Sequence, residues 1–430
     1  MKIAVVGLWH LGSVTAACLA ALGHTVVGFD QDPDTISELR NGRPPIYEPD
    51  LVGLIQQATD SSYLRFSSDP RDLADNDLIW ITYDTPVDEQ DRADSDQIVR
   101  RVAALFPYLS DGSIVIISSQ VPIGSTRKLS ALYRRDRPFS GVSFAYSPEN
   151  LRLGQAITAF RQPERVVIGA DEDVDRSRIV ALFEPITSQL EWMSVESAEM
   201  TKHALNAFLA TSITFANELA ILCERTGADA GEVARGIKSD SRVGPRAYLR
   251  PGSAFAGGTL ARDLVYLVEA TVRENLPAYL LPAVLRSNDE HKHWPRRQLL
   301  AHLGQVRQKP IGLLGLTYKA GTNTLRRSAA TELGRWLHDA GATVSAYDPS
   351  LKSLPADLAV VVELRPSIKA VLEGSEAIVI ATDWPEFLAI RAADVAVWMR
   401  NPLVIDPGRF LEGQLGADDR ITYVAVGRPR

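Results

Sequence analysis

A lysine and an asparagine four residues apart form the first pair in this chain that could do chemistry. Lys202 and Asn206 lie in the stretch AEMTKHALNAFLA, so in a helix their side chains project from the same face. An ammonium and an amide that project together into a cleft can hold an alcohol and stabilise the oxyanion of a carbonyl. A solvated lysine on an amphipathic helix is the alternative interpretation of the same spacing.

The segment after this helix has a composition that suits phosphate binding. Residues 241–263, SRVGPRAYLRPGSAFAGGTLARD, contain four arginines, four glycines and two prolines in 23 positions. Arginine side chains and exposed backbone N–H groups suit a diphosphate. A flexible surface loop is the other interpretation of this composition.

A glycine-rich loop follows the first apolar run of the chain. KIAVV leads into GLWHLGS, with Gly7 and Gly12 where a dinucleotide-binding turn needs a tight bend and a close contact between helix and strand. Asp30 ends the next apolar run, where it could accept hydrogen bonds from a ribose diol and favour NAD over NADP. Trp9 replaces the middle glycine, so a nucleotide fold that no longer binds its nucleotide is the alternative.

Two further segments follow apolar runs, at the strand ends where open α/β sheets bind ligands. YDTPVD (83–88) comes after LIWIT, and SSQVPIGST (118–126) comes after SIVII. Thr85 and Pro86 could equally form an ordinary turn.

The elements that must position these residues alternate between apolar runs and helical patterns. Up to residue 193 the runs are KIAVVG, TVVGFD, LIWIT, SIVIISS, VSFAYS and RVVIGA, which are typical of a parallel sheet covered on both faces. One long helix is predicted from about Ser194 to the region of Gly227. Strand-like runs then return as IGLLGL, TVSAYD, AIVIAT, LVIDPG and ITYVAV.

We therefore predict an α/β chain with two Rossmann-like, doubly wound domains joined by a long central helix and a helical domain. The predicted boundaries are 1–193 for a nucleotide-binding domain, 194–295 for the helical domain and 296–430 for the second α/β domain. The second domain echoes the first, since Gly315 and Asp348 repeat the order of Gly7 and Asp30.

Composition narrows the classes of function. The 430 residues are 45% hydrophobic and 23% charged, which is ordinary for a soluble globular protein. A net charge of −7 argues against nucleic acid as a partner. The two cysteines, Cys18 and Cys223, and seven histidines without a His-x-x-x-His pair predict no disulfide framework and no metal site. No apolar stretch approaches the ~20 residues of a membrane span, and no signal-peptide pattern occurs, so we expect no membrane partner and a cytoplasmic location.

Taken in order, these segments resemble the UDP-glucose/GDP-mannose dehydrogenase family. The resemblance extends over RNGRPPIYEPDL, DTP, VPIGST, SPENLR, PERVVIGA, FANELAILCERTGAD and GLTYKAGTNTLRRS. Enzymes of this family oxidise the carbon-6 alcohol of a nucleotide sugar to a carboxylate with two NAD. The resemblance implies NAD in the N-terminal domain, the nucleotide diphosphate in the C-terminal domain, and a homodimer built on the central helix.

The resemblance also implies roles for individual residues. Catalytic roles are implied for Lys202, Asn206, Asp263, Thr259 and Glu149. Cofactor contacts are implied for Gly7, Leu11, Gly12, Asp30, Thr85 and Gln120. Substrate contacts are implied for Leu151, Arg242, Tyr248, Arg250, Gly252, Gly257, Lys319 and Arg326, with Arg242 reaching the neighbouring subunit's site.

The chain departs from the family pattern at a few of these places. Thr259 stands where the family has the cysteine nucleophile of the second oxidation, after Gly258 in place of a serine. Leu153 replaces a glutamate that assists hydrolysis of the thioester, and Gln120 replaces a threonine that orders a water. Trp9 replaces the loop glycine. Three of these changes affect formation or hydrolysis of a thioester.

The leading interpretation is an NAD-dependent nucleotide-sugar dehydrogenase with a rebuilt second half-reaction. Such an enzyme would stop at an aldehyde or ketone, or oxidise an aldehyde hydrate directly. The alternative is a non-catalytic nucleotide-sugar-binding protein on the same scaffold, which Trp9 favours and which the retained Lys202, Asn206 and Asp263 disfavour.

Overall fold

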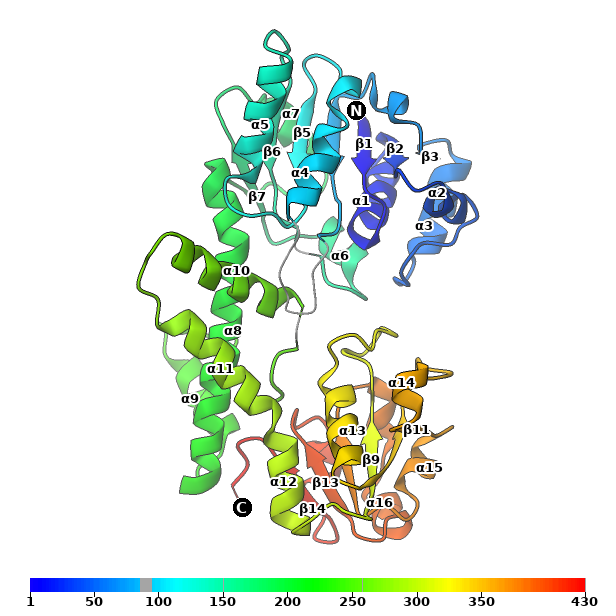
Figure 1. The fold of residues 1–430 in the computed structure, drawn as a ribbon, viewed down its shortest axis with the longest axis vertical. Coiled ribbons are helices and arrows are strands. Elements are labelled where there is room, and N and C mark those ends of the chain that lie inside the picture. Colours follow the sequence, from blue (N-terminus) through cyan, green and yellow to red (C-terminus); the bar gives the residue numbers. More distant parts are fainter. Residues whose placement is uncertain (86–94, 150, 257, 430) are drawn as a thin grey trace. The chain divides into compact units, whose positions relative to one another are not determined.

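The computed structural model describes residues 1–85, 95–149, 151–256 and 258–429 of the chain. It divides into two units, Met1–Ala204 and Leu205–Arg430, each containing one sheet (Figure 1).

The sheet of the first unit has eight strands in the order β3-β2-β1-β4-β5-β6-β7-β8. All neighbours are parallel except β6 and β7, so the predicted parallel sheet has one antiparallel pair, where the chain reverses through the short helix α6 (Ala156–Arg161). The six predicted runs all form strands, whereas β3 and β8 were not predicted because each carries a charged residue among its four. The strands are β1 Lys2–Val6, β2 Thr25–Phe29, β3 Leu64–Ser67, β4 Leu78–Ile81, β5 Ile114–Ile117, β6 Ser143–Tyr146, β7 Val166–Ala170 and β8 Leu190–Met193.

Helices cover both faces of this sheet, as a doubly wound fold requires. Ile3 and Val5 pack into a core with α1 and α3, whereas Ala4 and Val6 face a second core that includes α4 and α5. This alternation follows from the two-residue period of a strand. The helices of the unit, besides α6, are α1 His10–Ala21, α2 Pro33–Arg40, α3 Leu51–Asp60, α4 Ser95–Ala103, α5 Ser125–Asp136 and α7 Arg176–Phe183.

The predicted long helix is confirmed as α8, Val195–Thr226, with 32 residues. Contrary to our expectation, α8 is long and apolar enough to cross a membrane by length and composition, with a mean hydropathy of 1.4 in its most apolar window. This is weak support for a membrane span, because the core helix of a soluble protein passes the same test. Buried polar side chains interrupt its apolar sequence, among them Glu199, Lys202, His203, Asn206 and Asn217.

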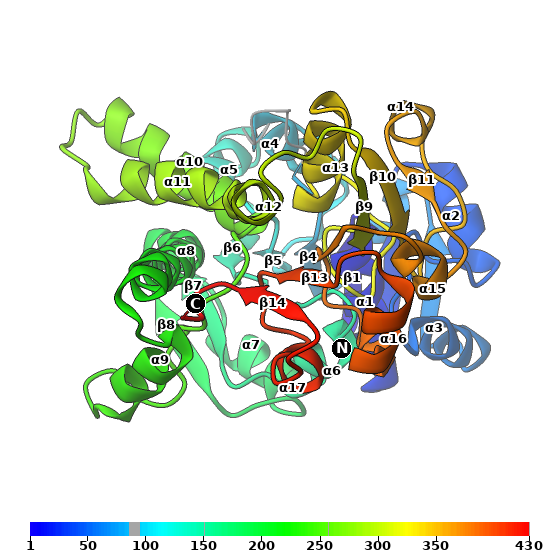
Figure 2. The same ribbon diagram turned by 90° about the horizontal axis from the view of Figure 1, so that it is seen from below.

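The second unit contains a parallel six-stranded sheet in the order β11-β10-β9-β12-β13-β14. Figure 2 shows this sheet from below, with α13 and α16 beside it. The five predicted runs all form strands, and β11 is an additional strand of two residues. The strands are β9 Pro310–Leu314, β10 Thr343–Tyr347, β11 Glu363–Leu364, β12 Ala377–Ile380, β13 Leu403–Asp406 and β14 Thr422–Ala425.

Helices also cover both faces of the second sheet. Side chains of α12 and α13 pack in one core, and those of α15, α16 and α17 pack in the other. The helices of this unit after α8 are α9 Ala230–Ser239, α10 Thr259–Arg273, α11 Leu280–Lys292, α12 Trp294–Leu303, α13 Ala329–Asp339, α14 Ala356–Ala359, α15 Ile368–Leu372, α16 Ala392–Trp398 and α17 Glu412–Leu415.

Candidate active site

Two glycines, Gly7 in the loop between β1 and α1 and Gly12 in the first turn of α1, have no room for a side chain. Gly7 has a φ of +94°, and a Cβ there would lie 2.5 Å from Tyr83 Cδ1 and 2.9 Å from Tyr83 N. At Gly12 a Cβ would lie 1.9 Å from the carbonyl oxygen of Gly7. The tight turn and the close helix–strand contact that the sequence predicts at these two positions are therefore present.

The surroundings of this loop fit a dinucleotide. Helix α1 has no acidic residue in its first turn and no side-chain cap, so its N-terminal N–H groups can face a pyrophosphate. Asp30 lies directly after β2, where Oδ2 accepts a hydrogen bond of 2.8 Å from Leu8 N and Oδ1 accepts one of 3.1 Å from Asp32 N. Trp9 is 48% exposed, so the indole is not part of the core beneath the loop.

Two other predicted cofactor residues lie together at the ends of neighbouring strands. Thr85 follows β4, Gln120 follows β5, and the buried Thr85 hydroxyl donates a 2.6 Å hydrogen bond to the carbonyl oxygen of Gln120. The rest of the YDTPVD segment, from Pro86 onwards, lies outside the described residues. The two strand ends are thus linked through backbone and hydroxyl groups.

A buried carboxylate that we did not predict links the cofactor loop to the segment before α6. Glu48 Oε2 lies 2.8 Å from His10 Nε2 and also accepts a 2.8 Å bond from Gly154 N. Glu48 Oε1 accepts a 2.8 Å bond from Ala156 N. The motif RNGRPPIYEPDL contains Glu48, but no spacing in the sequence connects it with His10 or with residues 154–156.

Two of the predicted catalytic residues, Lys202 of α8 and Glu149, form an ion pair. Lys202 Nζ donates to the Glu149 carbonyl oxygen at 2.6 Å and lies 3.1 Å from Glu149 Oε1, while Glu149 Oε2 accepts from Leu151 N at 3.0 Å. Only 7% of Lys202 is exposed. The alternative of a solvated surface lysine is therefore wrong. Leu11, Glu149 and Leu151 also line one small cavity of about 70 Å³.

Glu199, one turn before Lys202, holds the start of α5. Its buried carboxylate accepts hydrogen bonds from Gly124 N at 2.5 Å and Thr126 N at 2.9 Å. Burial raises the pKa of this carboxyl, while the bonds from Thr126 and Gly124 act in the opposite direction. Glu199 thereby ties the VPIGST segment to α8.

Asn206 and Asp263 form the second buried pair. The Asn206 amide donates to Asp263 Oδ2, and the exposed fractions of the two residues are 6% and 0%. Thr259 is the first residue of α10 and is exposed, one turn before Asp263 on the same helix. The preceding Gly258 has a φ of +117°, and the predicted substrate residue Gly257 lies outside the described residues.

Apart from Leu151 in the first unit and the undescribed Gly257, the predicted substrate residues separate into two groups in the second unit. Lys319 lines a cavity of about 230 Å³ together with Ser253, Ala254 and Tyr318, next to Gly252. The other residues lie on the surface. Arg250 donates a 2.8 Å bond to the Gly408 carbonyl oxygen, Arg242 forms an ion pair with Asp240 at 2.8 Å, and Tyr248 and Arg326 are exposed.

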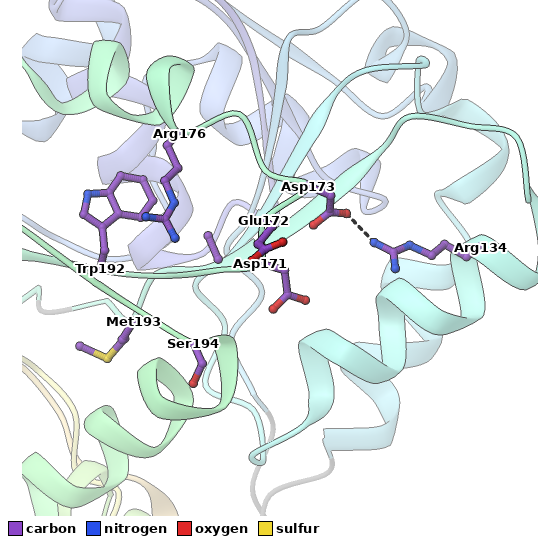
Figure 3. Close-up of a pocket in the computed structure, with 9 residues that line it drawn as sticks. Arg134, Asp171, Glu172, Asp173, Arg176, Trp192, Met193 and Ser194 are labelled. Atoms are coloured by element: carbon purple, nitrogen blue, oxygen red, sulfur yellow. Dashed lines mark hydrogen bonds and ion pairs between the residues drawn. The ribbon is translucent and has the colours of Figure 1, made fainter.

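A larger hollow of about 610 Å³ in the first unit contains none of the predicted site residues (Figure 3). Arg134 pairs with Asp173, and the Arg176 guanidinium stacks 4.9 Å from the Trp192 ring. Because these charges are paired with each other or with a ring, we place no chemistry there. Among the described residues no group of three or more His, Cys, Asp or Glu side chains could hold a metal, and a metal-free site stays a prediction.

Comparison with known proteins decides the family. The family models describe the NAD binding domain, the central domain and the UDP binding domain of UDP-glucose/GDP-mannose dehydrogenases, and they match residues 1–187, 196–290 and 312–413. The chain belongs to the UDP-glucose/GDP-mannose dehydrogenase family. The chain is therefore an NAD-dependent oxidoreductase whose substrate class is the nucleotide sugars.

Individual members of the family match over almost their whole length. The UDP-glucose 6-dehydrogenase of Rhizobium meliloti (strain 1021) is 34% identical over 438 residues, covering 100% of both chains. TuaD, a UDP-glucose 6-dehydrogenase of Bacillus subtilis (strain 168), is 32% identical over 431 residues, covering 100% of this chain and 93% of TuaD. A solved UDP-glucose dehydrogenase from Pyrobaculum islandicum matches with a TM-score of 0.84 and 31% identity over 95% of each chain. These relatives are named as enzymes, which supports the dehydrogenase interpretation over the non-catalytic one.

Proposed function

We propose that this family member oxidises an alcohol of a UDP-sugar to a carbonyl, with one NAD per sugar and without a thioester. The observation that carries the proposal is a contrast between the residues for the first oxidation, which are present, and those for the second, which are replaced. Lys202 and Asn206 are retained, buried and paired, whereas position 259 is an exposed threonine and position 153 a leucine. The UDP binding domain and the names of the relatives support a UDP-sugar.

The proposed roles follow from the chemistry of each side chain. When bound, NAD accepts the hydride that leaves the carbinol carbon. The retained glycines Gly7 and Gly12 and the carboxylate of Asp30 would hold the dinucleotide. Lys202 and Asn206, one turn apart on α8, would hold the alcohol oxygen and stabilise the negative charge that develops on it. We assign the alcohol proton to the carboxylate of Asp263, which already accepts from Asn206.

This chain lacks the thiol and the carboxylate that the second oxidation uses in the family. A threonine hydroxyl is far less acidic than a thiol, so Thr259 would form a covalent adduct with the carbonyl product poorly. Leu153 offers no carboxylate to activate water for hydrolysis. We therefore expect the carbonyl product to leave the enzyme.

We also propose a homodimer that buries one side of α8. Leu205, Phe208, Phe215 and Leu222 are large apolar side chains with exposed fractions of 37%, 66%, 49% and 58%. Their spacings of three and seven residues place them in one stripe along the helix. An exposed apolar stripe of this kind is typical of a protein–protein interface. A dimer would also be needed for Arg242 to reach a neighbouring site.

The decisive experiment counts NADH and identifies the product. UDP-, GDP- and TDP-sugars are incubated with the enzyme, hydroxylamine is added as a carbonyl trap, and NADH and product mass are measured. One NADH per sugar and a trapped carbonyl are expected. Two NADH and a carboxylate from the unmodified enzyme would show that it reaches the acid without a thiol and would refute the proposal.

A variant series separates the missing groups. Thr259→Cys alone should not restore acid formation, because water stays unactivated without the carboxylate. Thr259→Cys combined with Leu153→Glu and Gln120→Thr should give at least traces of the acid. Lys202→Met is the matched control, in which NADH formation should fall by orders of magnitude in every background.

A further inference from the structure

The backbone around Gly252 is held by buried polar side chains from two helices. Asn217 of α8 accepts a 2.9 Å bond from Gly252 N through Oδ1, and its amide donates to the Ser253 carbonyl oxygen at 3.3 Å. His291 Nε2 of α11 lies 2.8 Å from the Gly252 carbonyl oxygen, which can only accept, so this nitrogen carries the hydrogen.

The same helix α11 holds the other end of the segment. Asn288 accepts a bond from Phe255 N through Oδ1 and donates one to the Phe255 carbonyl oxygen, both at 2.9 Å. Asn217, Asn288 and His291 are 2%, 3% and 5% exposed, so all three act from the protein interior. We call these three residues the loop clamp.

The clamp replaces hydrogen bonds that regular structure would otherwise supply. Residues 252–255 belong to no helix or strand, and buried backbone groups need partners. The clamp holds Gly252 and Phe255 at the two ends of the segment. Between them, Ser253 and Ala254 line the cavity of about 230 Å³ that Lys319 also lines. The clamp therefore fixes the shape of one wall of this cavity.

We propose that Asn217, Asn288 and His291 are positioning residues that set the backbone of residues 252–255 for binding the nucleoside diphosphate part of the substrate. This inference rests on the proposed function, because it takes the cavity beside Lys319 as the nucleotide site. Asn217 and Asn288 are not among the described residues that line this cavity, so they act on the ligand through the backbone, whereas His291 both holds Gly252 and lines the cavity itself. Loss of one clamp residue should weaken nucleotide binding more than it slows turnover at saturation.

The expected loss of nucleotide affinity follows from the hydrogen bonds that each variant removes. A buried backbone group without its partner costs about 1–3 kcal/mol, and about 1.4 kcal/mol corresponds to a tenfold change in an equilibrium constant. If most of that cost falls on the bound loop conformation, the Kd for nucleotide should rise by about 5- to 100-fold. The KM for the UDP-sugar should rise similarly, with kcat changed by less than about threefold.

The test uses the full chain with UDP and GDP as probes. Both nucleotides are first titrated calorimetrically into the unmodified protein, and the tighter one serves as the probe. Asn288→Asp keeps the acceptor for Phe255 N and loses the donor, whereas His291→Leu loses the bond to Gly252. His291→Gln keeps an N–H donor and should restore most of the affinity. Ser287→Ala is the matched control, since this α11 side chain contacts Glu218 and not the loop.

The outcomes separate the inference from the function it rests on. A weaker probe affinity in Asn288→Asp and His291→Leu, with rescue by His291→Gln and with unchanged NAD affinity in variants that still unfold cooperatively, supports the clamp. An unchanged probe affinity in both folded variants overturns it, as does an equal loss of NAD affinity. If the unmodified protein binds neither nucleotide and forms no NADH, the proposed function fails instead.

Discussion

Replacing Glu48 tests whether this buried carboxylate supports the cofactor loop. In Glu48→Gln the amide oxygen can still accept from one backbone N–H, but the NH₂ group then faces the other N–H or the imidazole of His10. One buried donor loses its acceptor, at a cost of about 1–3 kcal/mol. Glu48→Ala leaves Gly154 N and Ala156 N both unpaired, so its cost should be about 2–6 kcal/mol.

Glu48→Gln should lower both the free energy of unfolding and the affinity for NAD. His10 lies at the start of α1, so its release should loosen the turn that faces the dinucleotide. We expect the NAD Kd of Glu48→Gln to rise about tenfold, which corresponds to about 1.4 kcal/mol. Urea unfolding gives the free energy of unfolding, and calorimetric titration gives the NAD affinity.

His10→Ala is the control that separates the contact of Glu48 with His10 from its contacts with the backbone of residues 154 and 156. It removes the imidazole and leaves the Glu48 bonds to residues 154 and 156 in place. NAD affinity should fall, while the free energy of unfolding changes by less than in Glu48→Ala. The double variant should show coupling of about 0.5–3 kcal/mol between positions 10 and 48. A Glu48→Gln protein with unfolding free energy and NAD affinity both unchanged would contradict this reasoning.

Three further predictions concern other parts of the chain. Gly12→Ala should abolish measurable NAD binding and lower the unfolding temperature, because its Cβ would meet the Gly7 carbonyl oxygen at 1.9 Å. Burial lowers the pKa of His291 from its ordinary 6.5, so the unfolded chain binds this proton more readily and the free energy of unfolding should fall as the pH drops through 6.5. His291→Gln should make that fall shallower in urea titrations at pH 7 and pH 5.5, and equal slopes would contradict the assignment. Light scattering at micromolar concentration should show a dimer, and Phe208→Ser with Phe215→Ser should shift it toward monomer.

Local patterns in the sequence predicted the regular elements well. The Val- and Ile-rich runs are buried strands, and the uninterrupted segment after Ser194 is one helix. The strands β3 and β8 were missed because LRFS and LEWM mix charged with apolar residues. The antiparallel pairing of β6 and β7 depends on how the connecting segment packs, which no local pattern records.

Long-range contacts limited what the sequence could reveal about the site. Residue type and spacing pointed to chemistry at positions 202 and 206, and the family resemblance pointed to positions 149 and 263. Their pairing depends on segments that are 53 and 57 positions apart. Glu48 and the loop clamp were not predicted, because the type of a residue does not indicate whether its carboxylate or amide is buried. Hydropathy of α8 was misjudged for a related reason, since scattered polar residues obscured how apolar the helix is.

The exposed indole in the cofactor loop has a practical consequence. Trp9 is one of seven tryptophans, and Trp80, Trp294 and Trp384 are buried away from solvent. NADH absorbs light at the wavelengths where indole emits, so a dinucleotide held beside Trp9 should quench its fluorescence by energy transfer. Trp9→Phe supplies the background signal from the other six. The residue that departs from the glycine pattern thus gives this protein an intrinsic optical reporter of cofactor occupancy, readable in a stopped-flow instrument without any label.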